Sequence, residues 1–149
     1  IKKDKKAKIE NNVKQILKEE ENFGIKKFET YKKFGEKVYK IRENVRKNIK
    51  KLKDKNKIII GYGAPAKATT ALNFFGITEE IDFIVEDNRL KHNKFIPGVR
   101  IPIKNKSEIK NKKNILIVLA WNFYKDIIKN NSKLSEKFIN IKDLEANNT

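Results

Sequence analysis

The segment from residue 57 to residue 77 constrains the fold more than any other part of the sequence. It consists of KIIIGYGAPAKATTALNFFGI. Residues 58–60 are apolar and β-branched, which is typical of a strand buried on both faces of a parallel sheet. Two glycines then allow a tight turn, and the apolar residues after Pro65 predict a helix over 65–75. This order of strand, turn and helix predicts a parallel α/β unit.

The remainder of the sequence continues this alternation. Further strands are predicted at 81–87, 100–103, 114–120 and 137–141, and helices at 106–111 and 122–131. We therefore predict an α/β fold with a Rossmann-like open, mainly parallel sheet and helices on both faces.

Two helices are predicted before the first strand, over residues 5–21 and 28–52, and Gly24 between them suits a helix C-terminal cap. In the second helix, apolar residues recur every three or four positions, and we interpret this continuous stripe as a packing face. The sequence thus predicts an N-terminal helical hairpin as a lead-in over 1–55 and a Rossmann-like domain over 56–145. The stripe consists of Phe28, Tyr31, Phe34, Val38, Ile41, Val45, Ile49 and Leu52.

Composition excludes several classes of protein. The 149 residues suit one domain of ordinary size. The sequence has no cysteine and a single histidine, His92, so disulfides and thiolate metal sites are excluded and a multi-histidine metal centre is disfavoured. No window has the apolar length of a membrane span and no signal peptide is visible, so we expect a cytoplasmic domain. Because the sequence begins at Ile1 and contains no methionine, we expect it to be a C-terminal fragment of a larger enzyme.

The formal net charge of +17 raises the alternative of a basic nucleic-acid-binding module. The lysines are spread along the whole chain, only four residues are arginine, and no dense basic block contains interleaved aromatic residues. We therefore interpret the charge as a lysine-rich surface that would attract a phosphorylated ligand.

Three loops are predicted at the carboxyl ends of the strands, where open α/β sheets bind ligands. The first, 61–67, has the spacing G-x-G-x-x-A, a dinucleotide fingerprint that is weak alone, and Lys67 in the first turn of the helix could meet an anion. The second, 86–88, offers an acidic side chain for a ribose hydroxyl, or is a solvated strand end or a helix cap. The third, 120–122, places Trp121 as a pocket wall or a core residue, with Asn122 as a hydrogen-bonding partner or a helix N-cap.

The segment 88–103 lies between the second and third of these loops. Pro97 and Gly98 predict a turn, and Lys91, His92 and Lys94 could reach a phosphate group. His92 has no orienting carboxylate that can be identified in the sequence, so its role stays open. These observations leave an NAD(P)-binding oxidoreductase domain as an alternative.

Three strings resemble, in this order and spacing, the C-terminal domain of the S-adenosylmethionine-dependent sugar C-methyltransferases, which act on nucleotide-linked deoxysugars. They are GYGAPAKATTALNFFGI, FIVEDNRLKHNKFIPGVRIPI and ILIVLAWNF. The helix FETYKKFGEKVYKIRENVRKNIKKL is similar to the lead-in of that domain. The resemblance covers about residues 20–135.

The resemblance implies a three-part enzyme. An N-terminal domain rich in cysteine binds zinc, a middle domain binds S-adenosylmethionine and holds the catalytic residues, and the C-terminal domain is Rossmann-like without its own dinucleotide. The nucleotide sugar lies between the middle and C-terminal domains. This sequence has no zinc cysteines, no S-adenosylmethionine loop and no catalytic Tyr-x-Glu-His stretch. We expect no catalytic residue and no cofactor in this chain, and as partners a nucleoside-diphosphate sugar and the middle methyltransferase domain of the same polypeptide.

The resemblance also assigns, by motif, a set of residues that hold the nucleotide and the phosphates of the sugar donor. In this sequence Ala68 replaces the glycine that commonly follows the lysine of the first motif. The assigned residues are Gly61, Tyr62, Gly63, Ala64, Lys67, Asp87, Asn88, Lys91, Pro97, Gly98, Trp121 and Asn122.

Overall fold

The computed structural model describes residues 10–55 and 57–146 of the chain. The chain divides into two compact units, Ile1–Tyr39 and Lys40–Thr149. The first unit contains α1, Asn11–Phe23, and the first half of α2, Phe28–Lys53; the rest of α2 belongs to the second unit. Residues 5–9 of the first predicted helix lie outside the described residues. The predicted division into 1–55 and 56–145 remains a prediction.

Gly24 ends α1 as predicted. Its φ of 79° is left-handed, and its N–H donates to the carbonyl oxygens of Glu20 and Glu21. Thr30 stabilises the same turn, because its Oγ1 donates to the Gly24 carbonyl oxygen at 2.9 Å.

The apolar stripe of α2 is buried in its second half only. Val45 and Ile49 are fully buried, whereas Phe28, Tyr31 and Phe34 are exposed. The prediction of one continuous packing face is therefore confirmed for the second half of the helix, and for the first half it stays a prediction. Periodicity shows which residues share a face of a helix, but it does not show what covers that face.

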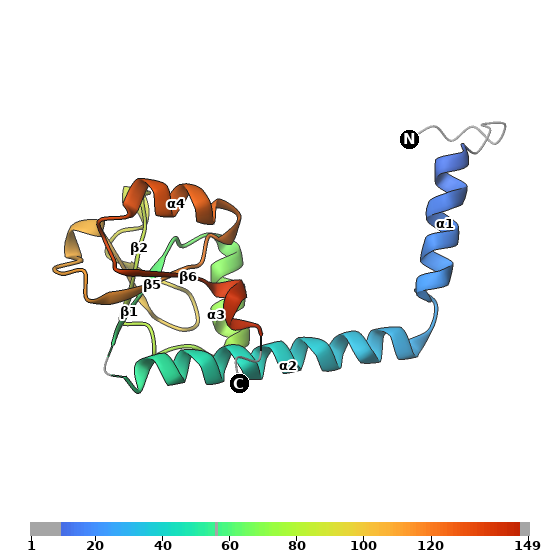
Figure 1. Ribbon diagram of the computed structural model, residues 1–149, viewed down its shortest axis with the longest axis horizontal. Helices are drawn as coiled ribbons and strands as arrows, with labels where there is room; N and C mark the ends of the chain where they lie inside the picture. Colours follow the sequence, from blue (N-terminus) through green and yellow to red (C-terminus); the bar gives the residue numbers. More distant parts are fainter. Residues whose placement is uncertain (1–9, 56, 147–149) are drawn as a thin grey trace. The chain divides into compact units, whose positions relative to one another are not determined.

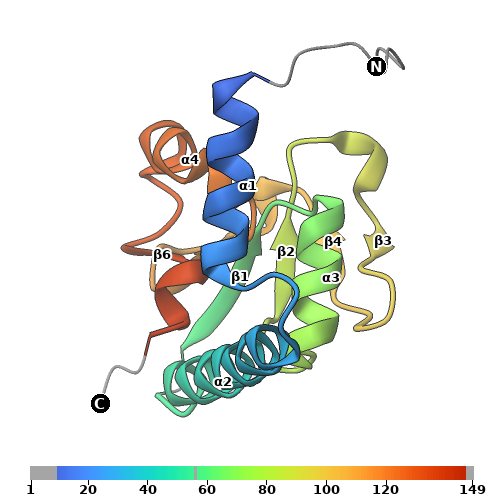
Figure 2. The ribbon, with the colours of Figure 1, turned by 90° about the vertical axis from the view of Figure 1, so that its right-hand side faces the viewer.

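A six-stranded sheet forms the centre of the second unit. Its strand order is β3-β4-β2-β1-β5-β6, and the strands labelled in Figure 2 lie in this order from β3 to β6. All neighbouring pairs are parallel except β3 with β4. The strands are β1, Ile58–Tyr62; β2, Phe83–Val85; β3, Lys94–Phe95; β4, Pro102–Lys104; β5, Asn114–Val118; and β6, Lys137–Asn140.

Helices cover both faces of this sheet, which confirms the predicted class. The second half of α2 and the whole of α3, Ala66–Phe75, pack on one face, around buried residues such as Ile59, Leu72 and Ile117. Helix α4, Tyr124–Asn131, packs on the other face, over Ile60 and Leu116. Figure 1 shows α3 and α4 on separate sides of the strands, with the second half of α2 passing below α3.

Short 3-10 helices complete the connections. They are η1, Arg89–Lys91; η2, Lys106–Glu108; η3, Trp121–Phe123; and η4, Ile141–Leu144. The predicted helix at 106–111 is wrong in length, because only η2 forms there and the chain is extended again at Ile109. Strand β3 was not predicted; two residues without alternation carry no periodic signal.

The register places the ends of four parallel strands at one edge of the sheet. Tyr62, the last residue of β1, pairs with Val85 of β2 and Val118 of β5, and Val118 pairs with Asn140 of β6. The chain passes from β1 to β2 on one side of β1, whereas β5 lies on its other side. The strand order therefore reverses between β1 and β5, where open α/β sheets bind ligands.

We predict that Ile49→Ala lowers the free energy of unfolding by about 2–5 kcal/mol, because it leaves a cavity where α2 packs on the sheet. Ile16→Ala is the matched control: Ile16 is 53% exposed on α1, and its replacement should change the free energy by less than about 0.5 kcal/mol. Urea unfolding of both variants measures this. Equal losses in the two variants would contradict the burial of Ile49 in the core.

Candidate functional site

Gly61 and Gly63 shape the turn at the end of β1. A Cβ on Gly61 would lie 2.7 Å from Ile84 Cγ1 and 3.0 Å from Leu119 Cδ1. Gly63 has a φ of +88°, and a Cβ there would lie 2.9 Å from the Cβ of Ala120. Both glycines therefore allow close approach of neighbouring segments. Packing within the fold is sufficient to explain the G-x-G spacing.

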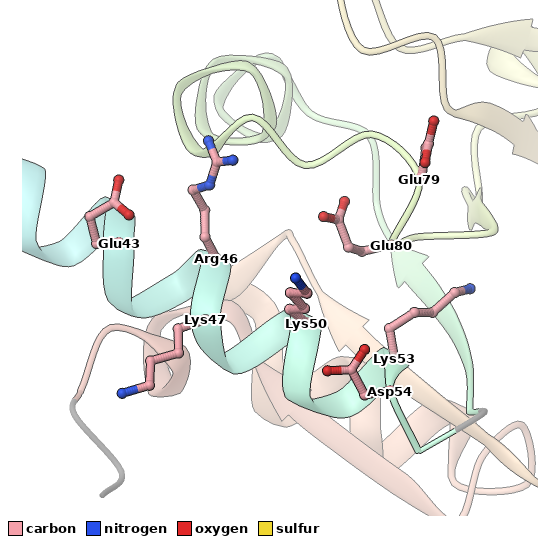
Figure 3. A pocket seen from close by; sticks show the side chains of 8 residues that line it. All are labelled: Glu43, Arg46, Lys47, Lys50, Lys53, Asp54, Glu79 and Glu80. Carbon is pink, nitrogen blue, oxygen red and sulfur yellow. The ribbon is translucent and has the colours of Figure 1, made fainter.

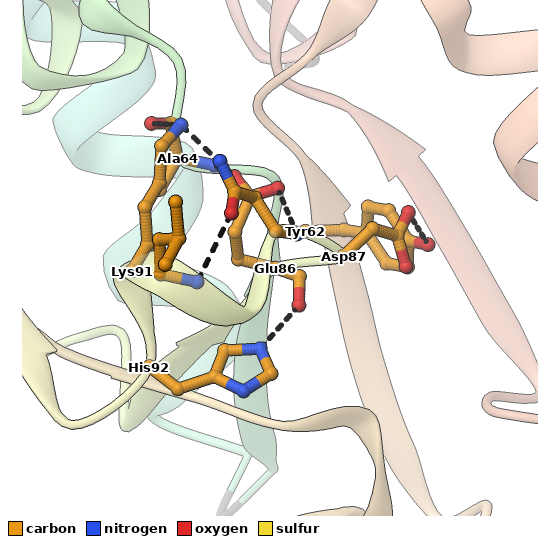
Figure 4. Close-up of polar contacts among 8 residues, drawn as sticks. Tyr62, Ala64, Glu86, Asp87, Lys91 and His92 are labelled. Atoms are coloured by element: carbon orange, nitrogen blue, oxygen red, sulfur yellow. Dashed lines mark hydrogen bonds and ion pairs between the residues drawn. The ribbon is translucent and has the colours of Figure 1, made fainter.

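The Glu86 carboxylate closes this turn from inside (Figure 4). Its Oε2 accepts the Ala64 N–H at 2.7 Å, and its Oε1 accepts the Asn88 N–H at 3.1 Å. Lys91 Nζ donates to the Ala64 carbonyl oxygen at 2.9 Å and lies 3.5 Å from Glu86 Oε2. Burial alone would raise the pKa of Glu86, but the N–H groups of Asn88 and Ala64 and the Lys91 ammonium lower it below its ordinary value.

This internal carboxylate argues against a dinucleotide at the loop. In dinucleotide-binding folds the pyrophosphate lies at N–H groups of the corresponding turn and helix N-terminus. Here the Ala64 N–H is occupied by Glu86, and Pro65, the N-cap of α3, has no N–H to offer. Of the two acidic residues in the loop 86–88, Glu86 binds the backbone of its own domain, and Asp87 contacts the side chains of Tyr62 and Lys106.

The side chains of His92 and Asn88 stabilise the segment after β2. His92 Nε2 lies 2.7 Å from the Glu86 carbonyl oxygen, and because a carbonyl only accepts, Nε2 carries the proton in this contact. Asn88 Oδ1 accepts the Leu90 N–H at 3.0 Å and so caps η1. The geometry gives both side chains structural roles at this turn.

Tyr62 and Asp87 are joined by Lys106, from η2, on the α4 face of the sheet. The Tyr62 hydroxyl donates to Asp87 Oδ2 at 2.9 Å, and Lys106 Nζ lies 2.6 Å from Asp87 Oδ1. Burial would raise the pKa of Asp87, but the hydrogen bonds from Lys106 and Tyr62 lower it. Burial and the Asp87 contact raise the pKa of Tyr62, so its hydroxyl stays protonated. Lys106 also reaches Asn131 Oδ1 at 3.1 Å and so ties the end of α4 to this network.

Lys67 and Trp121 meet on the opposite face, at the switch point between β1 and β5. Lys67 Nζ lies 4.2 Å from the centroid of the Trp121 ring, a cation–π contact between the first turn of α3 and η3. Trp121 is partly buried and packs against the core around α3. Two of the predicted site residues thus lie together where a ligand is expected.

The structure does not bring all the predicted residues together. Gly98, with a φ of +83°, lies against the Asn73 side chain near the end of α3, and Asn73 Nδ2 donates to the Pro97 carbonyl oxygen at 2.9 Å. Pro97 and Gly98 are therefore at the opposite end of α3 from Lys67. Asn122 is exposed in η3 and caps neither η3 nor α4, whose N-cap residues are Ala120 and Phe123.

A separate hollow lies between α2 and the segment before β2 (Figure 3). Acidic and basic side chains line it in equal numbers, so it has no preference for an anion. Nearby, Asp82 accepts both Lys53 Nζ at 2.8 Å and the Ile59 N–H at 2.9 Å, which fastens the start of β1. This hollow is at the amino edge of the sheet and is not part of the candidate site. Its lining residues are Glu43, Arg46, Lys47, Lys50, Lys53, Asp54, Glu79 and Glu80.

Sequence reasoning missed Lys106, Lys142 and the structural role of Glu86. Lys142, in η4, places its Nζ 5.7 Å from the centroid of the Trp121 ring. Neither lysine differs in its sequence context from the many other lysines of the chain. The hydrogen bond from the Ala64 N–H to Glu86 could not be predicted from the sequence, because it depends on how close the end of β2 lies to the turn after β1.

The fold and site together define a Rossmann-like domain whose glycine turn is closed by its own carboxylate and whose open edge carries an aromatic ring and lysines. The model of the C-methyltransferase C-terminal domain family matches residues 1–140. The chain is also 32% identical over 126 residues to the C-methyltransferase NovU of Streptomyces niveus, a match that covers 83% of this chain and 30% of that protein. The chain therefore belongs to the C-methyltransferase C-terminal domain family, and it spans less than a third of the length of that relative.

Two further findings concern residues 10–55 and 57–146. Within these ranges no group of three or more His, Cys, Asp or Glu residues could hold a metal ion. No helix in the same ranges is both long and apolar enough to cross a membrane.

We predict that Glu86→Gln lowers the free energy of unfolding at neutral pH by about 1 kcal/mol, because hydrogen bonds to a charged group are stronger than neutral ones. The pKa of Glu86 is lowered in the folded state, so its stabilisation is present above the unfolded-state pKa and is lost as the pH falls through the folded-state pKa. The difference between wild type and variant should therefore shrink in acid.

Urea unfolding at neutral pH and at several acidic pH values measures this difference. Glu79→Gln is the control, because Glu79 is exposed at the opposite edge of the sheet. A difference for Glu86→Gln that is constant with pH would show that the carboxylate charge does not stabilise the turn.

Proposed function

We propose that this chain is the substrate-binding domain of an S-adenosylmethionine-dependent C-methyltransferase that acts on a nucleotide-linked deoxysugar. Membership of the C-methyltransferase C-terminal domain family supports the class of enzyme. The observation that carries the proposal is the position of Lys67 over Trp121 at the switch point of the sheet. An ammonium group beside an aromatic wall suits a ligand with a phosphate and a planar base.

In this proposal the domain binds and orients, and the chemistry takes place in another domain. A base outside this chain removes the proton beside the keto group of the sugar, and the resulting enolate carbon forms a bond to the methyl carbon as the methyl–sulfur bond breaks. S-adenosylmethionine, bound in the middle domain, supplies the methyl group. The role of this chain is to hold the nucleotide end of the substrate, so that the sugar is presented in one orientation.

The middle methyltransferase domain of the same polypeptide is the second proposed partner. Large apolar side chains are exposed along α1 and the first half of α2, and such surfaces mark sites of interaction. They include Ile16, Leu17, Phe23, Phe28 and Phe34. The zinc site expected of the whole enzyme does not fit this chain, which has no cysteine, and no step of the mechanism here involves a metal.

The first test is activity. The chain should be folded but should transfer no methyl group from labelled S-adenosylmethionine to a nucleotide sugar, because a binding domain supplies no base. Circular dichroism checks the fold, and radioactivity in the isolated sugar nucleotide measures transfer against a buffer control. Transfer above that control would contradict the division of labour between domains, as would binding of S-adenosylmethionine at micromolar affinity.

Lys67→Ala should weaken binding of a nucleoside-diphosphate sugar by about ten- to a hundredfold, the worth of a charge-assisted contact to phosphate. It should not change the affinity for the uncharged nucleoside. Calorimetric titration with both ligands at one moderate salt concentration measures this, and the melting temperature should change little because alanine favours helices.

Lys110→Ala is the control for the loss of one positive charge. Lys110 is exposed near the start of β5, at the amino edge of the sheet. Equal affinity of wild type and Lys67→Ala for the diphosphate ligand would remove Lys67 from the site. A large loss of affinity in the Lys110 control would show that only the overall charge attracts the ligand.

A further inference from the structure

Two ammonium groups converge on the ring of Trp121. Lys67 Nζ lies 4.2 Å from its centroid and Lys142 Nζ lies 5.7 Å from it. The three residues come from different segments: the first turn of α3, the 3-10 helix after β5 and the 3-10 helix after β6. The fold therefore gathers them from positions far apart in the sequence.

Lys67 and Lys142 differ in their charge environment from three other lysines of the domain. Lys53, Lys91 and Lys106 each form an ion pair with an acidic side chain. Within the described ranges 10–55 and 57–146, neither Lys67 nor Lys142 forms one. An aromatic ring attracts an ammonium group but carries no net charge. The contact with the ring therefore leaves both positive charges able to pair with an anion.

The location of this cluster suits a ligand better than the glycine turn does. Trp121 follows β5 and Lys142 follows β6, so both lie at the carboxyl edge of the sheet, beside the switch point. At the glycine turn, in contrast, the Glu86 carboxylate accepts the Ala64 N–H and would repel an incoming phosphate. An anionic ligand is thus directed toward Trp121.

We propose that Lys67, Trp121 and Lys142 form a diphosphate-binding site, in which the two lysines contact the phosphate groups and Trp121 positions their ammonium groups. This inference rests on the proposed function for its ligand, and it adds Lys142 as a binding residue. A nucleoside diphosphate carries two linked phosphate groups, and the two lysines beside Trp121 provide one positive charge for each of them.

The single tryptophan of the chain makes this proposal directly measurable. Because Trp121 is the only source of tryptophan fluorescence, a ligand that binds to Lys67 and Lys142 should change the emission. The ligands are inorganic pyrophosphate, thymidine diphosphate and thymidine, titrated into the full chain at constant ionic strength. Pyrophosphate and thymidine diphosphate should change the emission in a saturable way, and thymidine should change it much less.

Lys142→Ala should raise the dissociation constants for pyrophosphate and thymidine diphosphate by about tenfold or more. Lys142→Arg should retain most of the affinity, because guanidinium also binds phosphate. Lys137→Ala is the matched control: Lys137 is exposed at the start of β6, and its replacement removes the same charge from the same part of the sequence. It should leave the dissociation constants unchanged.

The outcomes separate this inference from the proposed function. The two-lysine site is wrong if Lys142→Ala binds thymidine diphosphate as well as wild type does. It is also wrong if Lys142→Ala and Lys137→Ala lose affinity equally. In both cases the proposed function stands. If wild type binds neither a nucleoside diphosphate nor a nucleoside-diphosphate sugar, both are wrong. A selective loss in Lys142→Ala, with restoration in Lys142→Arg, supports the site.

Discussion

The pairing of β1 with parallel strands on both sides is the constraint on which the rest of the domain depends. Residues 58–62 of β1 align with all of β5, and its last three residues align with β2. The neighbours come so close that no side chain fits at Gly61, where Ile84 and Leu119 occupy the space. Parallel strands require crossovers, and these crossovers place α3 on one face, α4 on the other, and the loops after β1, β2 and β5 at a single edge. The candidate site is a consequence of this arrangement.

The glycine motif shows that a sequence pattern typical of ligand binding can instead be required for packing within the fold. In a dinucleotide-binding domain the turn after the first strand exposes N–H groups to phosphate. Here Glu86 takes the place of the phosphate at the Ala64 N–H, and Lys91 closes the other side of the turn. A carboxylate supplied by the domain itself makes the turn rigid without any cofactor. Binding of an anion is thereby shifted to the neighbouring loops, where the lysines around Trp121 have no acidic partner within the described residues.

The sequence predicted the sheet well and the site in part, for reasons that differ. The strands after Lys57 and Lys113 are continuous apolar runs, and Gly24 and Pro65 mark helix ends, so local patterns were sufficient for them. The rule that loops after parallel strands share an edge placed the loops of Lys67 and Trp121 together, but it did not predict the contact between the two side chains. Lys106 and Lys142 could not be predicted, because in a chain with so many lysines only the tertiary fold shows which of them reach Tyr62 or Trp121. Pro97 and Gly98 were predicted from motif similarity alone, and they lie against the other end of α3.

Helix α2 also shows that a local sequence pattern does not determine which apolar residues are buried. One apolar periodicity runs along the whole helix, yet Ile49 is buried and Phe34 is 66% exposed. A helix buries an apolar face only where another surface meets it, and for the second half that surface is the sheet with α3. The exposed half belongs to the first unit, and the chain spans 30% of the length of its relative NovU. The proposed function accounts for this difference between the two halves of α2. The sheet and the helices packed on it form the core and the phosphate-binding edge of the domain. The exposed apolar helices form the surface that contacts the catalytic domain.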